Sequence, residues 1–336
     1  MKKITIEEHF MTQEYLDCLR SLLEKKDPRP VITLDEKAEL SEKGFISGVG
    51  AGADSITSKL LDVGEGRLRE MDEVGIDMQV LSMAPGVQIL DASIGTPMAK
   101  KVNDKLSEIV RRYPKRFAGL ASLAPQNPTE AANELKRAVK ELGLKGACIN
   151  SHTKGEYLDD KKYWPIFEMA EKLGAPIYIH PRIPSPDMVK PYLAYPGLSS
   201  AACGFAAEVS LHALRLIYGG VFDQYPKLNI ILGHMGEGLP YWLWRIDNKG
   251  GAATSNLKKA PSEYIKNNFF ITTSGMFWLP ALMCAYLALG ADRILFAVDY
   301  PNESMKEAVQ FIESVPICDS DKEKICHSNL EKLLKL

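Results

Sequence analysis

The sequence lacks the features that mark several large classes of protein. No run of about 18 apolar residues interrupts it, which argues against a transmembrane helix. The opening stretch, with Lys2, Lys3, Glu7 and Glu8, is too charged for the apolar segment of a signal peptide, so we expect a cytoplasmic protein. Its 41 basic residues nearly balance its 43 acidic residues, so no net field recruits nucleic acid or an anionic membrane. We therefore expect small molecules as partners.

Cysteine is sparse, and no two cysteines form a Cys-x-x-Cys pair. The six cysteines are Cys18, Cys148, Cys203, Cys284, Cys318 and Cys326. This scatter favours reduced, buried thiols over disulfides or a thiolate zinc site. Phosphate-binding motifs are also missing, because the glycines at 44, 48, 50 and 52 fit neither the dinucleotide fingerprint nor a Walker loop with its lysine. We interpret that glycine-rich stretch as a flexible active-site loop.

Short β-branched or apolar runs alternate with helical patterns along the whole chain. The strand-like runs cover 3–9, 78–84, 117–122, 145–150, 175–180, 228–234, 269–274 and 293–299. Helices are expected to begin at Thr96-Pro97, after a cap at Asn127, and at Ser304 with Glu307 as its capping-box partner. Eight such units predict an α/β protein, a (β/α)8 TIM barrel with residues 1–336 as a single domain.

Two connections are too long for ordinary barrel loops. They are insertions over roughly 11–62, after the first strand, and 183–212, after the fifth. Both leave the barrel at the face where the strands end, which is where barrel enzymes place their active sites. We expect them to form the rim of a pocket.

Five ionisable side chains stand at strand positions that point to chemistry. Glu7 and His9 are two apart on the first strand, so period-2 alternation places them on one face. Taken alone, they could be a buried salt-bridge carboxylate and a satisfied core histidine. However, His180, His234 and Asp299 each end another strand at the same face. Their convergence favours a metal site.

The donor set narrows the metal and leaves other roles open. The proposed ligands are Glu7, His9, His180 and Asp299. Two imidazoles and two carboxylates without thiolate suit Zn²⁺, Mn²⁺ or Fe²⁺ and leave positions for substrate oxygens. Asp299 can be a ligand, a proton donor or both. Glu237 can orient the His234 imidazole, or it can simply complement a helix dipole in a first turn.

Arg245 and His212 are further candidates with less support. Arg245 follows Pro240-Tyr-Trp-Leu-Trp, a stretch too aromatic for a plain solvated helix face. Its guanidinium can therefore reach a carboxylate substrate or a neighbouring subunit, with a surface arginine as the equal alternative. His212 lies on a helical pattern where packing is expected rather than catalysis.

Several motifs resemble the amidohydrolase superfamily, and within it the non-oxidative decarboxylases typified by the γ-resorcylate (2,6-dihydroxybenzoate) enzymes. The resemblance spans nearly the whole chain and is carried by Ile6-Glu-Glu-His-Phe10, Tyr178-Ile-His-Pro181, His212-Ala-Leu-Arg-Leu216, 229–241, Trp244-Arg-Ile-Asp247, Ile271-Thr-Thr-Ser-Gly275, 292–296 and Asp299-Tyr-Pro301. Most of the superfamily opens with His-x-His, whereas Glu7-x-His9 is similar to the decarboxylase branch. The segment Tyr300-Pro-Asn-Glu303 departs from that branch, whose resorcylate enzymes tend to have Trp and Phe there.

The resemblance implies a role for each candidate. It implies one divalent ion, Zn²⁺ or Mn²⁺, held by Glu7, His9, His180 and Asp299, with catalytic residues Asp299, His234 and Glu237. It further implies that Arg245 serves an adjacent subunit's pocket in a homodimer or homotetramer. Phe205 is similar to the aromatic residue that faces the substrate in these enzymes.

The expected function is metal-dependent, non-oxidative decarboxylation of an ortho-hydroxy aromatic carboxylic acid, without an organic cofactor. In this hypothesis the aromatic carboxylate chelates the metal and Asp299 protonates the ring carbon that carries the carboxylate. The alternative is a metal-dependent hydrolase or hydratase that acts on a lactone or an unsaturated carboxylic acid. A third possibility is a metal-binding scaffold without catalysis.

Overall fold

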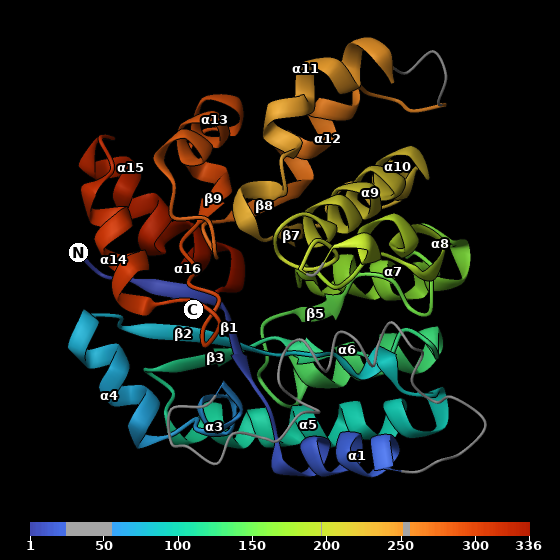
Figure 1. The fold of residues 1–336 in the computed structure, drawn as a ribbon, viewed down its shortest axis with the longest axis vertical. Coiled ribbons are helices and arrows are strands. Elements are labelled where there is room, and N and C mark those ends of the chain that lie inside the picture. The colour runs from blue at the N-terminus through green and yellow to red at the C-terminus, as the bar shows by residue number, and fades with distance from the viewer. Residues whose placement is uncertain (25–55, 196, 251–255) are drawn as a thin grey trace.

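Parallel strands form the centre of the protein, whose computed structural model describes residues 1–24, 56–195, 197–250 and 256–336 (Figure 1). The strands in these ranges are β1 (Ile4–Phe10), β2 (Met78–Met83), β3 (Phe117–Gly119), β4 (Ala121–Ser122), β5 (Ala147–Asn150), β6 (Ile177–His180), β7 (Ile230–Leu232), β8 (Phe269–Thr272) and β9 (Ile294–Leu295). Each lies within a run that the sequence predicted as a strand, except that β1 continues one residue beyond the predicted run, to Phe10. All pair in parallel, in the orders β1-β2-β3 and β4 through β9.

The two sheets are parts of one closed barrel. β3 and β4 are halves of the strand predicted at 117–122, and Leu120 between them donates its N–H to Leu81 O at 2.9 Å. The other junction is closed by a parallel bridge between Ile6 and Ala297. Eight strand positions therefore surround the centre, which confirms the predicted (β/α)8 barrel.

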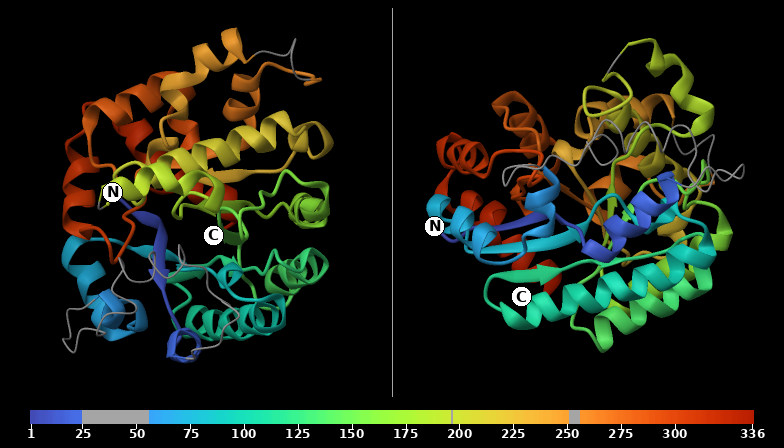
Figure 2. Two further views of the ribbon diagram at one scale, coloured as in Figure 1. Left: turned by 45° about the vertical axis from the view of Figure 1, so that its right-hand side comes forward. Right: turned by 60° about the horizontal axis from the view of Figure 1, so that its bottom comes forward.

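Helices surround these strands (Figures 1 and 2). They are α1 (Gln13–Glu24), α3 (Ile56–Leu61), α4 (Glu65–Val74), α5 (Ala92–Arg112), α6 (Pro128–Lys140), α7 (Trp164–Leu173), α8 (Pro186–Val189), α9 (Gly204–Tyr218), α10 (Val221–Gln224), α11 (Leu239–Lys249), α12 (Pro261–Asn268), α13 (Leu279–Leu289), α14 (Met305–Ser314), α15 (Asp319–Glu323) and α16 (Asn329–Leu334). Single-turn segments are η1 (Val87–Ile89), η2 (Lys161–Tyr163), η3 (Lys190–Ala194), η4 (His234–Gly236), η5 (Ala291–Arg293) and η6 (Lys324–Ser328). None of the described helices is long and apolar enough to cross a membrane.

The caps explain where several helices begin. Asn127 accepts the N–H of Glu130 at the start of α6, and Ser304 accepts the N–H of Glu307 at the start of α14, as predicted. The predicted start at Thr96-Pro97 is wrong. α5 begins at Ala92, because the carbonyl of Asp91 already accepts the N–H groups of the first turn, and the proline lies inside the helix.

The two insertions are only partly as expected. The first contains α1 and α3, and its glycine-rich stretch lies outside the described residues. The second ends earlier than predicted, because α9 already begins at Gly204. Val209, Ala213 and Leu216 recur at helical spacing and are buried, so one face of this helix packs against the core. The helix begins within the region predicted as an insertion.

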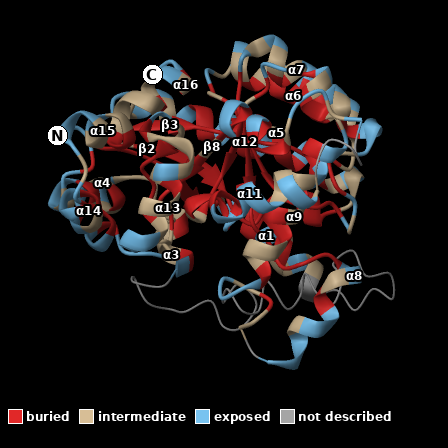
Figure 3. Ribbon diagram, turned by 90° about the horizontal axis from the view of Figure 1, so that it is seen from above, coloured by how far each residue is buried: buried red, intermediate tan, exposed pale blue. Residues whose placement is uncertain are grey.

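Two apolar clusters fill the protein. The larger one lies between strands and helices, and a smaller one includes Ile6, Val80, Leu120 and Ile231 from strands around the barrel interior. Figure 3 shows the buried residues concentrated in the central strands, with exposed residues on the outer helices. The barrel interior is therefore a packed core, and chemistry is confined to its ends.

Candidate metal centre

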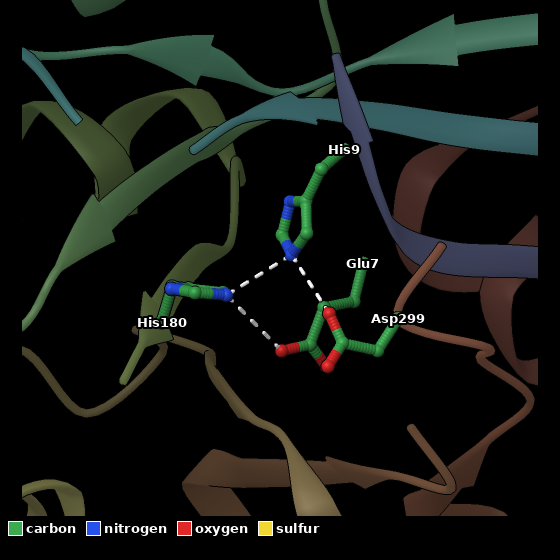
Figure 4. A group of neighbouring side chains, drawn as sticks. All are labelled: Glu7, His9, His180 and Asp299. Carbon is green, nitrogen blue, oxygen red and sulfur yellow. Dashed lines mark hydrogen bonds and ion pairs between the residues drawn. The ribbon is translucent and has the colours of Figure 1, made fainter. Parts of the chain in front are cut away.

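Four ionisable side chains converge at the carboxyl ends of the strands (Figure 4). One ligand atom from each of Glu7, His9, His180 and Asp299 lies within 4.8 Å of the others. His9 Nε2 lies 3.0 Å from His180 Nε2 and 3.0 Å from Asp299 Oδ1. His180 Nε2 lies 3.6 Å from Glu7 Oε1. The structure thus brings together the four residues predicted as ligands, and the first three are buried.

A bulge in β1 allows the first two ligands to share the barrel interior. The pairing register with β2 shifts between Ile6 and Glu8, and Glu7 has a φ of 71°. Ile6 belongs to the interior cluster and Phe10 to the outer one, so strict alternation would send His9 outward. The extra residue at Glu7 reverses the alternation. The predicted shared face is correct, and the bulge determines that this face is the barrel interior.

The Glu7 carboxylate is held on one side and left without a donor on the other. The hydroxyls of Tyr178 and Thr272 donate to Oε2, the latter at 3.3 Å. Oε1 is buried and has no hydrogen-bond partner among the described residues. Gly233 packs so closely that a Cβ there would lie 3.0 and 3.1 Å from the two carboxylate oxygens. One oxygen is therefore fixed toward the other ligands and needs a cation.

Polar neighbours select the ligating form of each imidazole. His9 Nδ1 lies 3.3 Å from Ser82 Oγ, and His180 Nδ1 lies 3.1 Å from Asn150 Nδ2. When each Nδ1–H donates to an oxygen, Nε2 keeps the lone pair that binds a metal. With the amide nitrogen of Asn150 on His180, the buried Asn150 Oδ1 has no partner. Rotating the amide by 180° brings this oxygen to His180 Nδ1–H. The two neighbours thus orient both Nε2 atoms for coordination.

The charges and donor atoms at this point fit one divalent ion. Burial raises the pKa of Glu7, although the His234 imidazole opposes that shift. A buried carboxylate is stabilised as an anion only by positive charge nearby. Two imidazole nitrogens and two carboxylates without sulfur suit zinc or manganese. The residues present therefore fit the metal that the sequence predicted.

His234 and Glu237 form a hydrogen-bonded pair beside the ligands. His234 Nδ1 lies 2.6 Å from Glu237 Oε1, and its Nε2 lies 3.9 Å from Glu7 Oε1 and 3.8 Å from Asp299 Oδ2. Burial alone would lower the pKa of His234, but the carboxylates of Glu237 and Glu7 raise it well above its ordinary value. The pair can hold a proton next to the ligands.

The segment around that pair departs from ordinary helix geometry. His234, Met235 and Glu237 all have φ near +50°, at 48°, 55° and 54°. A Cβ on residue 275 would lie 3.0 Å from the His234 ring. A glycine at this position therefore leaves room for the imidazole. Backbone in such sparsely populated regions is typical of functional sites. These left-handed conformations place the His234 imidazole beside the ligand residues. The hydrogen bond with His234 accounts for the position of Glu237 without the helix-dipole role.

Asp299 lies after β9 and also has a left-handed backbone, with φ 79°. Burial alone would raise its pKa, but hydrogen bonds with His234 and His9 lower it below the ordinary value. Asn302 donates its side-chain N–H to Asp299 Oδ1 at 3.0 Å. This carboxylate is therefore charged and oriented by contacts from three directions.

Arg245 and Phe205 lie on helices, outside this group. Arg245 is exposed on α11, and Phe205 is partly buried in the first turn of α9. Both therefore lie on helices, whereas the four ligand residues lie on strands or after the end of one.

Four polar contacts of the site were missed by sequence reasoning, namely those of Tyr178, Thr272, Ser82 and Asn150. Tyr178 lies two residues before His180 on β6, so alternation alone would have placed it on the same interior face. Asn150 ends β5 and Ser82 lies in β2, where a polar side chain in a buried strand is itself a signal.

A second polar cluster resembles a hydrolytic triad but has the wrong polarity. His212 Nε2 accepts the N–H of Leu158 at 3.2 Å, so its Nδ1–H must donate to Ser151 Oγ at 3.0 Å. Ser151 in turn donates to Glu208 at 2.9 Å. The imidazole therefore cannot take a proton from the serine, and burial lowers the pKa of His212 to about 3. The expectation that His212 serves packing is confirmed.

A parallel barrel with a Glu/His/His/Asp donor set at its carboxyl face defines a metal-dependent barrel enzyme. Residues 57–336 match the model of the amidohydrolase family, and this chain belongs to that family. The sequence is 39% identical to the gamma-resorcylate decarboxylase of Polaromonas sp., over 99% of this chain and 98% of the relative.

Two solved structures share the fold over the full chain. The 5-carboxyvanillate decarboxylase from Sphingomonas paucimobilis is 40% identical, with a TM-score of 0.92 and coverage of 100% of this chain and 99% of that one. The dihydroxybenzoic acid decarboxylase from Polaromonas sp. is 39% identical, with a TM-score of 0.87 and coverage of 100% and 97%. The latter was solved with bound manganese and the inhibitor 2-nitroresorcinol.

Proposed function

We propose that this chain is a metal-dependent decarboxylase that releases CO₂ from an aromatic acid with a hydroxyl group ortho to its carboxylate. The carrying observation is that Glu7 and His9, together with His180 and Asp299, converge where His234 and Glu237 hold a hydrogen-bonded pair. The relatives named decarboxylases, one with manganese and a resorcinol inhibitor, support the same reaction class.

The metal would be held by Glu7, His9, His180 and Asp299. When bound, the divalent ion supplies Lewis acidity that binds and orients oxygens of the substrate. Tyr178 and Thr272 donate to Oε2 of Glu7 and so hold the carboxylate in one orientation. Its other oxygen, Oε1, then need not reorient when substrate enters.

Asp299 would deliver the proton that replaces the carboxylate. The proton moves from its carboxyl oxygen to the ring carbon that bears the carboxylate, which interrupts aromaticity. The bond from that carbon to the carboxylate then breaks, CO₂ leaves, and the electron pair restores the ring. One proton is consumed for each CO₂. Since the carboxyl of Asp299 is ionised in the resting site, it must take up this proton before the transfer.

His234 and Glu237 would hold the phenolic oxygen beside the reacting carbon. The carboxylate of Glu237 on Nδ1 leaves Nε2 free to donate, and Nε2 is the atom that faces Glu7 and Asp299. A donor fixed at that point stabilises negative charge on an oxygen as the ring is protonated.

A panel of carboxylated phenols tests this function. The enzyme is stripped of metal with a chelator and then loaded with Mn²⁺. It is incubated separately with 2,6-dihydroxybenzoate, 5-carboxyvanillate and benzoate, and the released CO₂ is measured. We expect CO₂ from one or both ortho-hydroxy acids and none from benzoate, which lacks the hydroxyl. Turnover of a lactone or unsaturated acid to a hydrated product, without CO₂ from any phenol, would overturn the proposal.

The proposed assembly is a homodimer or homotetramer in which Arg245 reaches the neighbouring subunit's pocket. Tyr241, Trp244 and Arg245 recur at i, i+3 and i+4 on α11, and the two aromatic residues are 79% and 72% exposed. Large aromatic side chains with an arginine are typical of an interface core. In this assembly Phe205, on the first turn of α9, would pack against the substrate ring.

A further inference from the structure

The barrel closes along a seam that is irregular at the metal centre. Ile6 N–H donates to Phe296 O at 3.2 Å, and His9 N–H donates to Tyr300 O at 2.7 Å. Between these two bonds lies the β1 bulge at Glu7. The backbone of β1 therefore cannot supply a regular ladder of acceptors to the facing segment.

A side chain fills this gap. The carboxylate of Glu8 accepts the N–H of Val298 at 3.0 Å and the N–H of Tyr300 at 3.3 Å. These two residues flank Asp299, whose φ of 79° is rarely adopted by a residue with a side chain. Glu8 is fully buried, so no water replaces these contacts.

We propose that Glu8 is a positioning residue that holds Asp299 in its left-handed conformation and thereby sets the affinity for the metal. The two neighbouring glutamates point in different directions: Glu7 lies with the ligands, and Glu8 lies across the seam. Glu8 acts through Asp299 and contacts neither metal nor substrate. This inference rests on the proposed role of Asp299 as a ligand.

Arg67 secures the other side of the same seam. It is fully buried, donates to His9 O at 2.6 Å, and lies 4.6 Å from the centre of the Tyr300 ring. It also donates to Lys59 O at 3.0 Å, which ties the seam to α3. The Arg67 guanidinium thus contacts β1, which carries Glu7 and His9, and the ring of Tyr300 next to Asp299. Burial raises the pKa of Glu8 to about 8, and the charge of Arg67 opposes this rise.

The variant Glu8→Gln tests the inference because its size is unchanged. The amide offers one acceptor and one N–H₂ group, so a donor would face one of the two backbone N–H groups. We expect the dissociation constant for Mn²⁺, measured by calorimetry on the metal-free variant, to be at least about 10-fold higher than that of the wild type. At saturating Mn²⁺ we expect kcat to fall more than KM changes. The Mn²⁺ spectrum by electron paramagnetic resonance should also change.

Glu134→Gln is the matched control. Glu134 is also a buried glutamate, bound by Asn103 and Arg137 away from the ligands. It should lose thermal stability without a change in the Mn²⁺ dissociation constant or kcat. If Glu8→Gln does not fold, Glu8→Asp, which is shorter by one methylene, is measured by the same criteria.

Wild-type Mn²⁺ affinity and kcat in a folded Glu8 variant would overturn the inference, as would equal losses of Mn²⁺ affinity in Glu134→Gln. Metal binding is read without substrate, so the test is separate from the proposed reaction. An enzyme that binds Mn²⁺ in a Glu8-dependent manner but releases no CO₂ would contradict the decarboxylase function and leave the role of Glu8 standing.

Discussion

The Nε2 atoms of His9 and His180 face each other at 3.0 Å, with their Nδ1 atoms turned to polar neighbours. A proton shared between the rings would satisfy one pair of nitrogens but not the buried Oε1 of Glu7. A divalent ion satisfies all three atoms at once. The donor set therefore accounts for side chains that would otherwise be costly to bury.

Metal binding should stabilise the fold through Glu7. Chelation is expected to lower the melting temperature and abolish activity, and Mn²⁺ should restore both. At free Mn²⁺ about 100 times its dissociation constant the gain is about 2.7 kcal/mol. Glu7→Gln should lose most of this Mn²⁺-dependent shift in differential scanning fluorimetry, whereas Lys2→Gln, at the surface, should keep it. An unchanged shift in Glu7→Gln would exclude that residue as a ligand.

The Asn150 amide should control metal affinity without touching the ion. Asn150→Ala removes the side-chain amide that lies 3.1 Å from His180 Nδ1 and, once rotated, accepts its N–H; it should weaken Mn²⁺ binding about 10- to 100-fold in a calorimetric titration. Asn150→Asp keeps an acceptor at that position and serves as the matched variant, with affinity near or above that of the wild type. Equal affinities for the alanine and aspartate variants would show that the contact does not orient the ring.

Strand positions and ligands were predictable because both follow from local rules. Apolar runs of about six residues between helical patterns mark strands, and a parallel barrel places every strand's carboxyl end on one face. His180 and Asp299 follow such runs directly, so their convergence needs no knowledge of loops. The resemblance added roles to these residues and did not change their places.

The bulge at Glu7 and the seam contacts of Glu8 could not be predicted in the same way. The bulge appears only in the register between β1 and β2. The contacts of Glu8 join β1 to the segment after β9, almost 300 positions away, and form only when the barrel closes. Pairs such as Tyr178 with Glu7 were missed for the same reason. The start of α5 was missed because the proline within it appeared to be a first-turn residue.

The buried His212 should make stability depend on pH. Its pKa is about 3 in the folded protein and about 6.5 when unfolded, so the unfolded state binds the extra proton between these values. Its contribution is complete above pH 6.5 and is lost as pH falls toward 3, at about 1.4 kcal/mol per pH unit. In urea unfolding at pH 7, 6 and 5, His212→Gln should show a shallower decline than the wild type.

Val209→Ala, one turn earlier on α9, is the control for that experiment. It removes buried apolar volume and should lower stability by a similar amount at each pH. If His212→Gln declines as steeply as Val209→Ala, the imidazole does not carry the proton that drives the loss.

Arg245 should act in the partner's site if the assembly is as proposed. Arg245→Ala and Asp299→Asn should each be nearly inactive alone. In a heterodimer of the two variants, one of the two sites has both an intact Asp299 and an intact Arg245. Random pairing makes about half of the dimers heterodimers, so about a quarter of all sites should be active. Recovery absent from mixtures that demonstrably contain heterodimers would place Arg245 outside the neighbouring pocket.

Asp299→Asn separates the proposed proton donor from the ligand. The amide keeps the shape and an oxygen but carries no transferable acidic proton, so CO₂ release at saturating Mn²⁺ should fall about 10²- to 10⁴-fold. Binding of 2-nitroresorcinol, followed by its absorbance, should change far less, because the other three ligands remain. Asn302→Ala removes only the hydrogen bond to Asp299 Oδ1, and it should cost less than about 10-fold. Turnover near the wild-type rate in Asp299→Asn, with the protein folded and metal bound, would assign the proton to another group. His234, which is not one of the four proposed ligands and lies 3.8 Å from Asp299 Oδ2, is then the candidate.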